Sequence, residues 1–229
     1  MKYAFTAQQL ADLKALLDTL ATPYQRRWYA DGLVHRRRSY TKHRQAGADM
    51  FFALEGLIDA MESGRNQHYF APLLKYALAW SRKYICHFAA QVGVKIAQDD
   101  SDITFTNGAT IAFHGGLGLY LAALHGNVYI SEYAWCNHPY ALYQSALGVS
   151  CNKRYRLTLF TSVSPNAEAF AVWKRSQAKG FSQVHTINDS VAQGGVWDSL
   201  DVEAFKRESS PEEFRQMYLC EWPQQEAAE

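Results

Sequence analysis

The sequence lacks any apolar run that approaches the roughly 18 residues of a membrane-spanning helix. Its first residues, MKYAFTAQQL, also lack the apolar segment of a signal peptide. The cysteines lie far apart and form no CxxC pair: Cys86, Cys136, Cys151 and Cys220. These absences predict reduced core thiols in a soluble, cytosolic protein.

An excess of charge of one sign is also absent. Lys and Arg number 23 against 22 Asp and Glu, which leaves a formal net charge of +1. This balance argues against a strongly basic protein that coats nucleic acid, although it leaves room for a local basic patch. At 48% hydrophobic and 14% aromatic residues, the chain is too apolar to be disordered. Its 229 residues fit one large domain or two very small ones.

Apolar residues recur at helical or strand spacing along most of the chain. Helices are expected at about residues 6–20, 23–32, 48–63, 73–92, 139–147, 200–208 and 210–220. Strands are expected at 67–71, 94–96, 102–106, 109–114, 127–133 and 155–162. Residues 34–41 make a poor strand, because three consecutive arginines are rarely buried. The alternation of helix and strand predicts an α/β fold with a parallel sheet covered on both faces.

The first segment with chemical potential is residues 42–49, KHRQAGAD, just ahead of the helix expected at 48–63. A loop that opens a helix directs backbone N–H groups and the positive end of the helix dipole at one spot, which suits phosphate. Against the pattern GxxxxGK[ST], Gly47 fits the second glycine, while Lys42 stands at the first. Ala48 replaces the usual lysine and Asp49 the usual Ser/Thr, so an ordinary solvated turn is the alternative.

A second segment is the apolar strand Val128–Tyr133, which ends in Glu132, 85 residues beyond Gly47. A Walker-B strand ends in carboxylates that reach Mg²⁺ and the attacking water. The usual pair there is Asp-Glu, whereas this chain has Ser131 and Glu132. The alternative is an ordinary surface glutamate that follows a buried strand.

A third segment, residues 157–162, is an apolar strand that ends in the hydroxyls of Thr161 and Ser162. Polar groups at a strand end beside the phosphates can sense the γ-phosphate and couple hydrolysis to motion. Most such pairs simply cap a strand or a turn.

Taken in this order, the segments resemble the ATPase domain of the large terminase subunit of tailed phages, in the branch with a deviant Walker A motif. The resemblance covers about residues 20–222 and is carried by Pro23–Trp28 (adenine segment), Lys42–Gly47 (P-loop), His125–Tyr133 (Walker B), Phe160–Ser162 (coupling) and Ser209–Trp222 (closing segment). It implies a three-layer RecA-type (ASCE) P-loop NTPase core with a mostly parallel central sheet. ATP and Mg²⁺ are the implied cofactors.

The resemblance also implies a role for each matching residue. Gln25 would read adenine, Lys42 would neutralise phosphate charge, and Arg44 would touch the γ-phosphate or act on a neighbour's site. Glu132 would orient the attacking water as the catalytic residue beside Arg44. The remaining implied contacts are His43, Gln45, Ala46, Gly47 and Ala48 around the nucleotide, with Thr161 and Ser162 for coupling.

Two departures from the family pattern look like an exchange. Asp49 stands where the family has the Mg²⁺-binding hydroxyl, and Ser131 stands where it has the Walker-B aspartate. Because Mg²⁺ needs only one or two carboxylates together with phosphate and water, swapped ligands would preserve its shell. The alternative is decay in a prophage remnant.

Length is a third departure, because large terminases also carry a metal-dependent nuclease. Residues 1–229 are expected to form one ATPase domain, with a helical segment at 1–33, a core at 34–180 and a closing segment at 181–229. Beyond residue 160 the sequence shows no set of three or four strand-end carboxylates for two-metal cleavage, so no DNA cutting is expected.

The resemblance implies an ATP-driven motor that translocates viral DNA into the procapsid, in the cytoplasm of a bacterial host. Its partners would be double-stranded DNA, the procapsid portal, the small terminase subunit and further copies of the chain in a ring, with a monomer in isolation as the alternative. A degenerate nucleotide- or DNA-binding module without ATP turnover is one rival function. A P-loop helicase or remodelling ATPase is another.

Other residues invite weaker interpretations. Residues 36–38, three arginines, would meet DNA phosphate or a neighbour's nucleotide, or would form a solvated edge. His125, His138 and Cys136 lie close together but lack a second paired ligand set for zinc, so core roles are favoured. Core or interface packing is expected of the tryptophans Trp28, Trp80, Trp135 and Trp173.

Overall fold

A sheet of eight strands forms the centre of the computed structural model, which describes residues 1–99, 101–116 and 123–223. The strand order is β1-β4-β5-β3-β6-β7-β2-β8. The strands are β1 (Lys2–Tyr3), β2 (Arg37–Lys42), β3 (Gln67–Ala71), β4 (Ile103–Phe105), β5 (Thr110–Gly115), β6 (Asn127–Ser131), β7 (Leu157–Thr161) and β8 (Phe181–His185). Of the seven pairings among the described residues, only β4–β5 is antiparallel, and Asn107-Gly108 forms its predicted turn.

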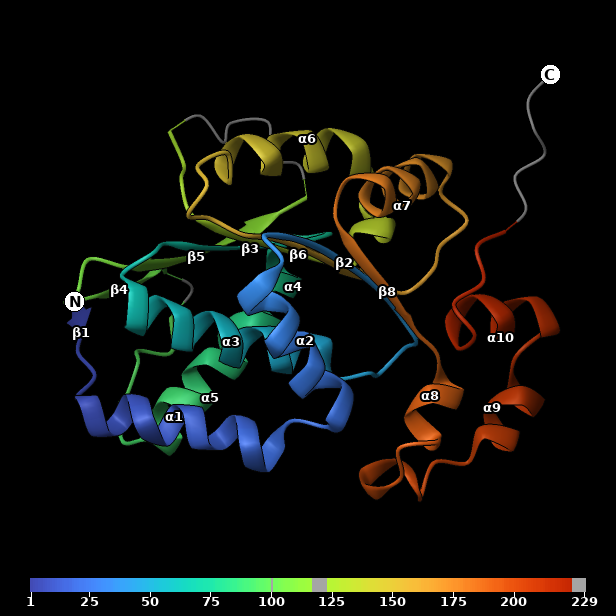
Figure 1. The fold of residues 1–229 in the computed structure, drawn as a ribbon, viewed down its shortest axis with the longest axis horizontal. Helices are drawn as coiled ribbons and strands as arrows, with labels where there is room; N and C mark the ends of the chain where they lie inside the picture. Colours follow the sequence, from blue (N-terminus) through green and yellow to red (C-terminus); the bar gives the residue numbers. More distant parts are fainter. Residues whose placement is uncertain (100, 117–122, 224–229) are drawn as a thin grey trace.

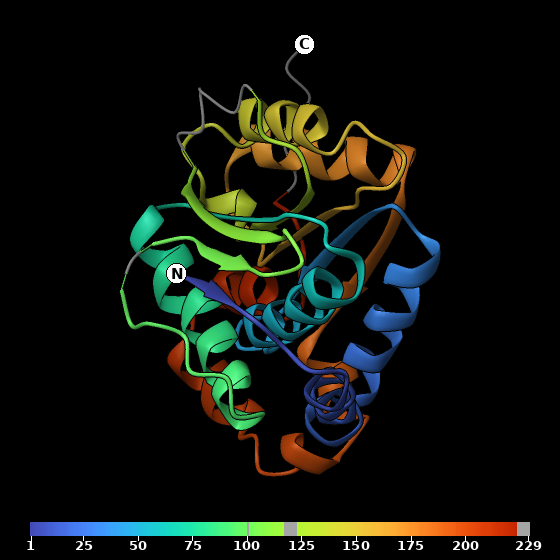
Figure 2. The same cartoon turned by 90° about the vertical axis from the view of Figure 1, so that its left-hand side faces the viewer.

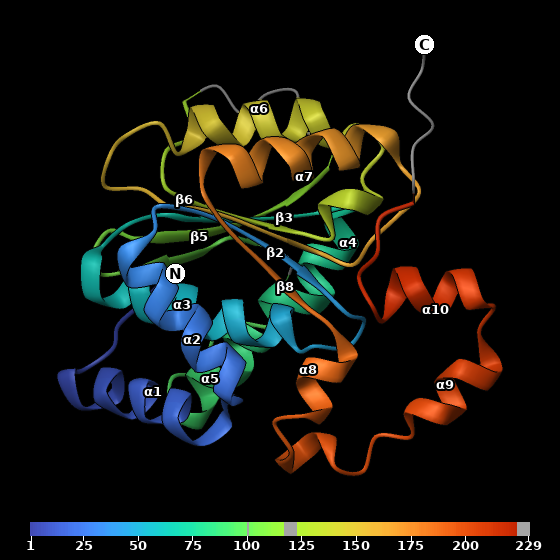
Figure 3. The ribbon, with the colours of Figure 1, turned by 45° about the vertical axis from the view of Figure 1, so that its right-hand side comes forward.

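Helices cover both faces of this sheet. The α-helices are α1 (Ala7–Leu20), α2 (Pro23–Val34), α3 (Ala48–Ser63), α4 (Leu74–Ala77), α5 (Lys83–Gln91), α6 (Pro139–Val149), α7 (Ala167–Lys179), α8 (Ile187–Val191), α9 (Val202–Glu208) and α10 (Pro211–Met217). Helices α6 and α7 lie on one face, and α1 to α5 lie on the other (Figures 1 and 2). Helices α8 to α10 lie together beside the end of β8 (Figure 3). The predicted three-layer α/β architecture with a mostly parallel sheet is therefore confirmed.

The register brings three strand ends to one edge of the sheet. Thr41 of β2 pairs with Thr161 of β7, and Ser131 of β6 pairs with Phe160 of β7. Strand β7 thus lies between β6 and β2, and all three run in the same direction. In parallel sheets ligands bind outside the carboxyl ends of the strands, so this edge is the place to seek a site.

Strand β2 contradicts the expectation that three arginines prevent a strand. The guanidinium of Arg38 is fully buried and forms an ion pair with Glu55 of α3. It also donates to the hydroxyl of Thr158 over 3.0 Å and to the carbonyl of Trp28 over 2.7 Å. Burial is possible because each donor group has a partner. Neither a solvated edge nor contact with DNA phosphate describes Arg38.

Four further expectations need correction. Residues 94–96 form no strand, because the N–H of Val94 bonds back to the carbonyl of Ala89 and closes α5. The helix expected at 73–92 contains a π-helical turn, Leu78–Arg82, between α4 and α5. Strand β8, whose sequence FSQVH has weak alternation, was not expected, nor was α7. Cys151 is exposed, whereas the other three cysteines are buried as expected.

Among the described residues, no helix has the length and apolar character needed to cross a membrane.

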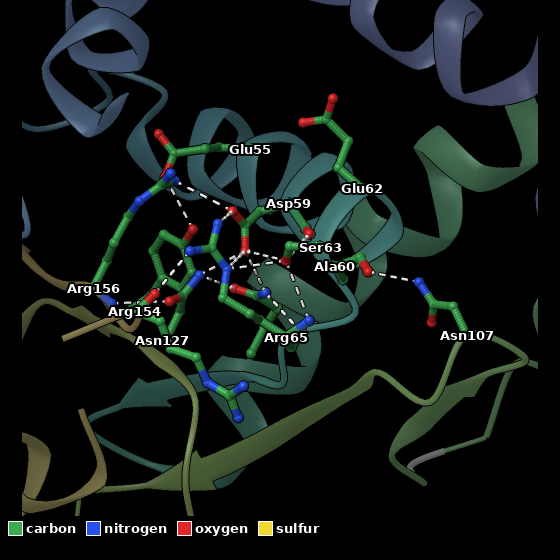
Figure 4. A network of polar contacts seen from close by, with 12 residues as sticks. Glu55, Asp59, Ala60, Glu62, Ser63, Arg65, Asn107, Asn127, Arg154 and Arg156 are labelled. Atoms are coloured by element: carbon green, nitrogen blue, oxygen red, sulfur yellow. Dashed lines mark hydrogen bonds and ion pairs between the residues drawn. The ribbon is translucent and has the colours of Figure 1, made fainter. Parts of the chain in front are cut away.

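A polar network at the opposite edge of the sheet centres on Asp59 of α3 (Figure 4). Its carboxylate accepts hydrogen bonds from Asn127 at the start of β6, over 2.7 Å, and from Gln67 at the start of β3, over 2.9 Å. It also forms ion pairs with Arg65 and Arg156. The Asp59 carboxylate thus connects the end of α3 to the beginnings of β3 and β6 and, through Arg156, to the beginning of β7.

We expect Asp59→Asn to lower the free energy of unfolding by about 3 kcal/mol, because the substitution removes the charge that two largely buried arginines share. Urea denaturation measures this loss. The matched control is Glu62→Gln on the same helix. Glu62 points away from the network in Figure 4 and pairs with Lys14 in solvent, so its loss should cost less than about 1 kcal/mol. Equal losses of stability in Asp59→Asn and Glu62→Gln would contradict the stabilising role of the Asp59 network.

Candidate active site

The loop between β2 and α3 has the backbone shape of an anion site. Gln45 and Gly47 both adopt left-handed conformations, with φ of 66° and 68°. Helix α3 begins directly after the loop and runs for 16 residues, so the positive end of its dipole lies there. The structure therefore supplies the strand–loop–helix geometry that residues 42–49 were expected to form.

Helix α2 holds this loop from one side. The hydroxyl of Tyr24 donates to the carbonyl of Ala46 over 2.7 Å. The amide of Gln25 donates to the carbonyls of Ala46 and Gly47 over 3.2 and 3.3 Å, and its oxygen accepts from the N–H of Thr22. Gln25 is only 2% exposed, and these hydrogen bonds direct its side chain at the loop itself. Its adenine-reading role stays a prediction.

The C-terminal segment holds the loop from the other side. The N–H of His43 donates to the carbonyl of His185, and the N–H of Arg44 donates to the carbonyl of Met217, each over 3.0 Å. The rings of His43 and His185 both contact the Ser190 hydroxyl over 2.8 Å. Burial lowers the pKa of each histidine to about 4, so both are neutral at pH 7. Both ring nitrogens of His43 have partners within the protein, the Arg44 carbonyl and the Ser190 hydroxyl, rather than being free to meet a phosphate.

The loop borders a cleft of about 1040 Å³. The predicted site residues that line it are Lys42, Arg44, Gln45, Ala46, Gly47, Ala48, Asp49, Glu132 and Ser162. The predicted residues outside its lining are Gln25, His43, Ser131 and Thr161. The remaining lining residues, which were not predicted as site residues from the sequence, are Met50, Pro72, Tyr76, Trp80, Tyr84, Trp135 and Tyr218.

An ion pair between Lys42 and Glu132 crosses the end of β7. The two side chains are only 6% and 15% exposed. The second carboxylate oxygen of Glu132 accepts hydrogen bonds from the backbone N–H and the hydroxyl of Ser162, over 2.8 and 2.9 Å. Burial alone would raise the pKa of Glu132, but the Lys42 charge and these hydrogen bonds outweigh burial and lower the pKa. Glu132 is therefore an anion at neutral pH.

The two exchanged residues lie in direct contact. The Ser131 hydroxyl, at the end of β6, donates to the Asp49 carboxylate, in the first turn of α3, over 2.6 Å. Burial raises the pKa of Asp49 to about 6, although the Lys42 charge opposes the shift. The described residues contain no group of three or more His, Cys, Asp or Glu that could hold a metal. The Asp49 carboxylate and the Ser131 hydroxyl are hard oxygen donors, which fit Mg²⁺ when phosphate and water complete the shell.

Aromatic side chains that were expected in the core form a wall of the cleft. Tyr76 and Trp80 stack with ring centroids 4.9 Å apart and an interplanar angle of 5°. Tyr84 lines the cleft with them, since residues four apart lie on the same face of a helix. Trp135 is 43% exposed in the same cleft. Trp80 and Trp135 were expected to pack in the core or at an interface, whereas both line the cleft.

We expect Asp49→Asn to stabilise the metal-free protein increasingly as the pH rises. The folded-state pKa of Asp49, about 6, lies above its ordinary 3.8, so the wild type loses stability as the pH rises between these values. The asparagine variant escapes this loss, and its advantage should grow by about 2–3 kcal/mol between pH 4 and pH 7. Urea denaturation in a chelator measures the difference.

Glu132→Gln is the matched counterpart with the opposite sign. The lowered pKa of Glu132 adds stability above its ordinary pKa of 4.5, and the glutamine variant lacks that contribution. Its deficit should therefore widen as the pH rises. A difference for Asp49→Asn that is constant with pH would contradict the burial of this carboxyl.

Comparison with known sequences places most of the chain in one family. Residues 40–228 match the family model described as terminase large subunit, T4likevirus-type, N-terminal. The terminase ATPase subunit of Escherichia phage P2 is 28% identical over 254 aligned residues, which cover 99% of this chain and 43% of that protein. A probable terminase ATPase subunit of Haemophilus phage HP1 is 26% identical and covers 82% of this chain and 35% of its own length. The chain spans less than half the length of these curated relatives.

Solved structures show the same fold. The large terminase of a thermophilic bacteriophage superposes with a TM-score of 0.63 at 13% identity, over 93% of this chain and 52% of that one. The HK97 large terminase gives 0.64 at 14% identity, over 87% and 50%. The ATPase domain of Thermus phage P74-26 gives 0.58 at 12% identity, over 82% and 89%. The first of these proteins is also solved with ADP and with ATP-gamma-S. These matches confirm the predicted RecA-type core.

Proposed function

Because the chain belongs to the T4likevirus-type family of terminase large-subunit N-terminal domains, we propose that it binds ATP with Mg²⁺ in the cleft and hydrolyses it to drive DNA packaging. The observation that carries the proposal is the Lys42–Glu132 ion pair across β7, beside a loop whose backbone conformation suits phosphate binding. A buried cation for the phosphates and a buried carboxylate for the water are the two groups that phosphoryl transfer needs.

Each charged residue has a defined task in this proposal. The backbone N–H groups of residues 45–48 and the Lys42 ammonium bind the phosphates, which frees one oxygen of Glu132 from Lys42. That oxygen then orients the attacking water, while Ser162 keeps its hold on the other oxygen. Asp49 and Ser131 would hold Mg²⁺, which neutralises charge on the β- and γ-phosphates when bound.

Arg44 and the end of β7 complete the proposed site. The Arg44 side chain is exposed in the cleft, where it can reach the γ-phosphate or serve a neighbouring copy. Thr161 and Ser162 contact Glu132, so a change at the carboxylate reaches β7 directly. This contact supports the coupling role expected of the two hydroxyls.

The wider role follows from the family and its named relatives. Relatives named as terminase ATPase subunits support double-stranded DNA, the procapsid portal and the small terminase subunit as partners of an assembled ring. Action in the host cytoplasm and the reading of residues 1–229 as one ATPase domain belong to the same proposal. A requirement for the portal, rather than strand unwinding, separates this motor from a helicase.

A second candidate function is nucleotide binding without turnover. It is favoured by the fact that Lys42 and Glu132 already satisfy each other and that Asp49 is held with a raised pKa. If Glu132 stays paired with Lys42 when ATP binds, its carboxylate does not orient the attacking water. The chain would then bind nucleotide without hydrolysing it and serve as an assembly module. Turnover separates the two functions.

The decisive experiment measures Mg²⁺-dependent ATP turnover by the chain alone, with DNA, and with portal-bearing procapsids. We expect Glu132→Gln to lower kcat by about 10²–10⁴-fold while ATP binding survives, because the variant loses only the group that orients water. Asp49→Ala should weaken the dependence on Mg²⁺. Glu62→Gln, on the surface of α3, serves as the control. Absence of turnover in all three states, with binding retained, would favour the assembly module.

A further inference from the structure

Trp135 has an unusual position for a large aromatic residue. Its side chain is 43% exposed in the wall of the cleft, three residues after Glu132. The short 3₁₀ turn Tyr133–Trp135 follows Glu132, and the N–H of Trp135 donates to the Glu132 carbonyl over 2.9 Å. Trp135 shares the cleft with Tyr76 and Trp80, and exposed apolar surface that gathers in a groove marks a binding site.

The indole of Trp135 is connected to the Glu132 carboxylate through one hydroxyl. Its Nε1–H donates to the Ser162 Oγ over 3.0 Å, and that hydroxyl donates to Oε2 of Glu132 over 2.9 Å. An indole N–H can only donate, and a serine hydroxyl carries a single hydrogen. The Ser162 hydroxyl must therefore accept from Trp135 and direct its own hydrogen at Glu132.

Because the Ser162 hydroxyl donates to Glu132, the two oxygens of the carboxylate have different partners. Oε2 receives the hydroxyl and the backbone N–H of Ser162, whereas Oε1 faces Lys42. Without the indole, the Ser162 hydroxyl is free to rotate, as hydroxyls do. Oε2 would then be held by the backbone N–H of Ser162 and the longer contact from the Thr161 hydroxyl, over 3.3 Å, which leaves the carboxylate freer to turn about its terminal torsion.

The backbone at Glu132 shows how firmly the carboxylate is held. Glu132 has a φ of 50°, in the left-handed region that non-glycine residues rarely adopt. Such a conformation persists only where surrounding contacts determine it. The bonds from Ser162 and Trp135 supply those contacts on both the side chain and the main chain.

We propose that Trp135 is a positioning residue that fixes the Ser162 hydroxyl on Oε2 of Glu132 and so presents Oε1 to the cleft. Because the ring itself lines the cleft, a nucleotide that contacts it also acts on the carboxylate. The consequence for turnover rests on the proposed function, whereas the hydrogen-bonded relay belongs to the nucleotide-free chain.

The relay is tested first by the ¹⁵N–¹H signals of the six tryptophan indoles, without any nucleotide. Trp135→Phe identifies the Trp135 signal. We expect Glu132→Gln to move that signal, because the charge that Ser162 transmits is gone. In a Ser162→Ala background the same substitution should leave the signal in place, and Ser162→Thr, which keeps a hydroxyl, should restore the response. A response that persists in Ser162→Ala overturns the relay.

Turnover supplies the second measurement. Trp135→Phe keeps an aromatic ring but removes the N–H, so we expect kcat to fall about tenfold with little change in KM for ATP. A purely structural role for Trp135 would not separate kcat from KM in this way. Trp173→Phe on α7, outside the cleft lining, is the matched control and should leave kcat and KM unchanged.

The two measurements separate the two proposals. Coupled indole signals without ATP turnover in any state would retain the relay and overturn the ATPase function. Turnover with uncoupled signals, or with an unchanged kcat in Trp135→Phe, would overturn the role of Trp135 and leave the ATPase function intact.

Discussion

The ion pair between Lys42 and Glu132 is the constraint around which the rest of the structure is arranged. Both charges are largely buried, so each needs a partner at all times. They come from β2 and the end of β6, which are neighbours only through β7, and the parallel order of these strands is what brings them to one edge. A phosphate that binds Lys42 must replace Glu132 as its partner, which links occupancy of the loop to release of the carboxylate.

Helix α3 and strand β6 form a ladder that fixes this edge of the sheet. Alternate residues of a strand share one face, and the three that face α3 each donate to a carboxylate of the helix. The pairs are Ser131 with Asp49 over 2.6 Å, Tyr129 with Glu55 over 2.9 Å, and Asn127 with Asp59 over 2.7 Å. Glu55 also pairs with Arg38 of β2, so the same ladder reaches the strand that carries Lys42. These hydrogen bonds therefore fix the position of the loop at the start of α3 relative to the Walker-B strand β6.

Local patterns in the sequence predicted those elements whose signals are strong. Helix 48–63 and strand 67–71 have the expected bounds, because apolar periodicity and Gly64 mark them clearly. Long-range partners decided the rest. Arg38 is buried only because Glu55 meets it from another element, and the aromatic wall brings Trp80 together with Trp135 from a distant part of the chain. The contacts of His43 with Ser190 join residues 147 positions apart, which no local pattern encodes.

The proposed exchange of Asp49 and Ser131 follows from the same ladder. A second carboxylate in place of Ser131 would lie beside the carboxyl of Asp49, and two such charges cannot both ionise there. A hydroxyl in both places would remove the Asp49 charge that lies near the Lys42 ammonium and leave Glu132 to balance it. One carboxylate and one hydroxyl keep the charge of the edge constant whichever element carries which. Random decay would not be expected to return the complementary residue at the facing position, so the pairing favours a compensated site over a lost one.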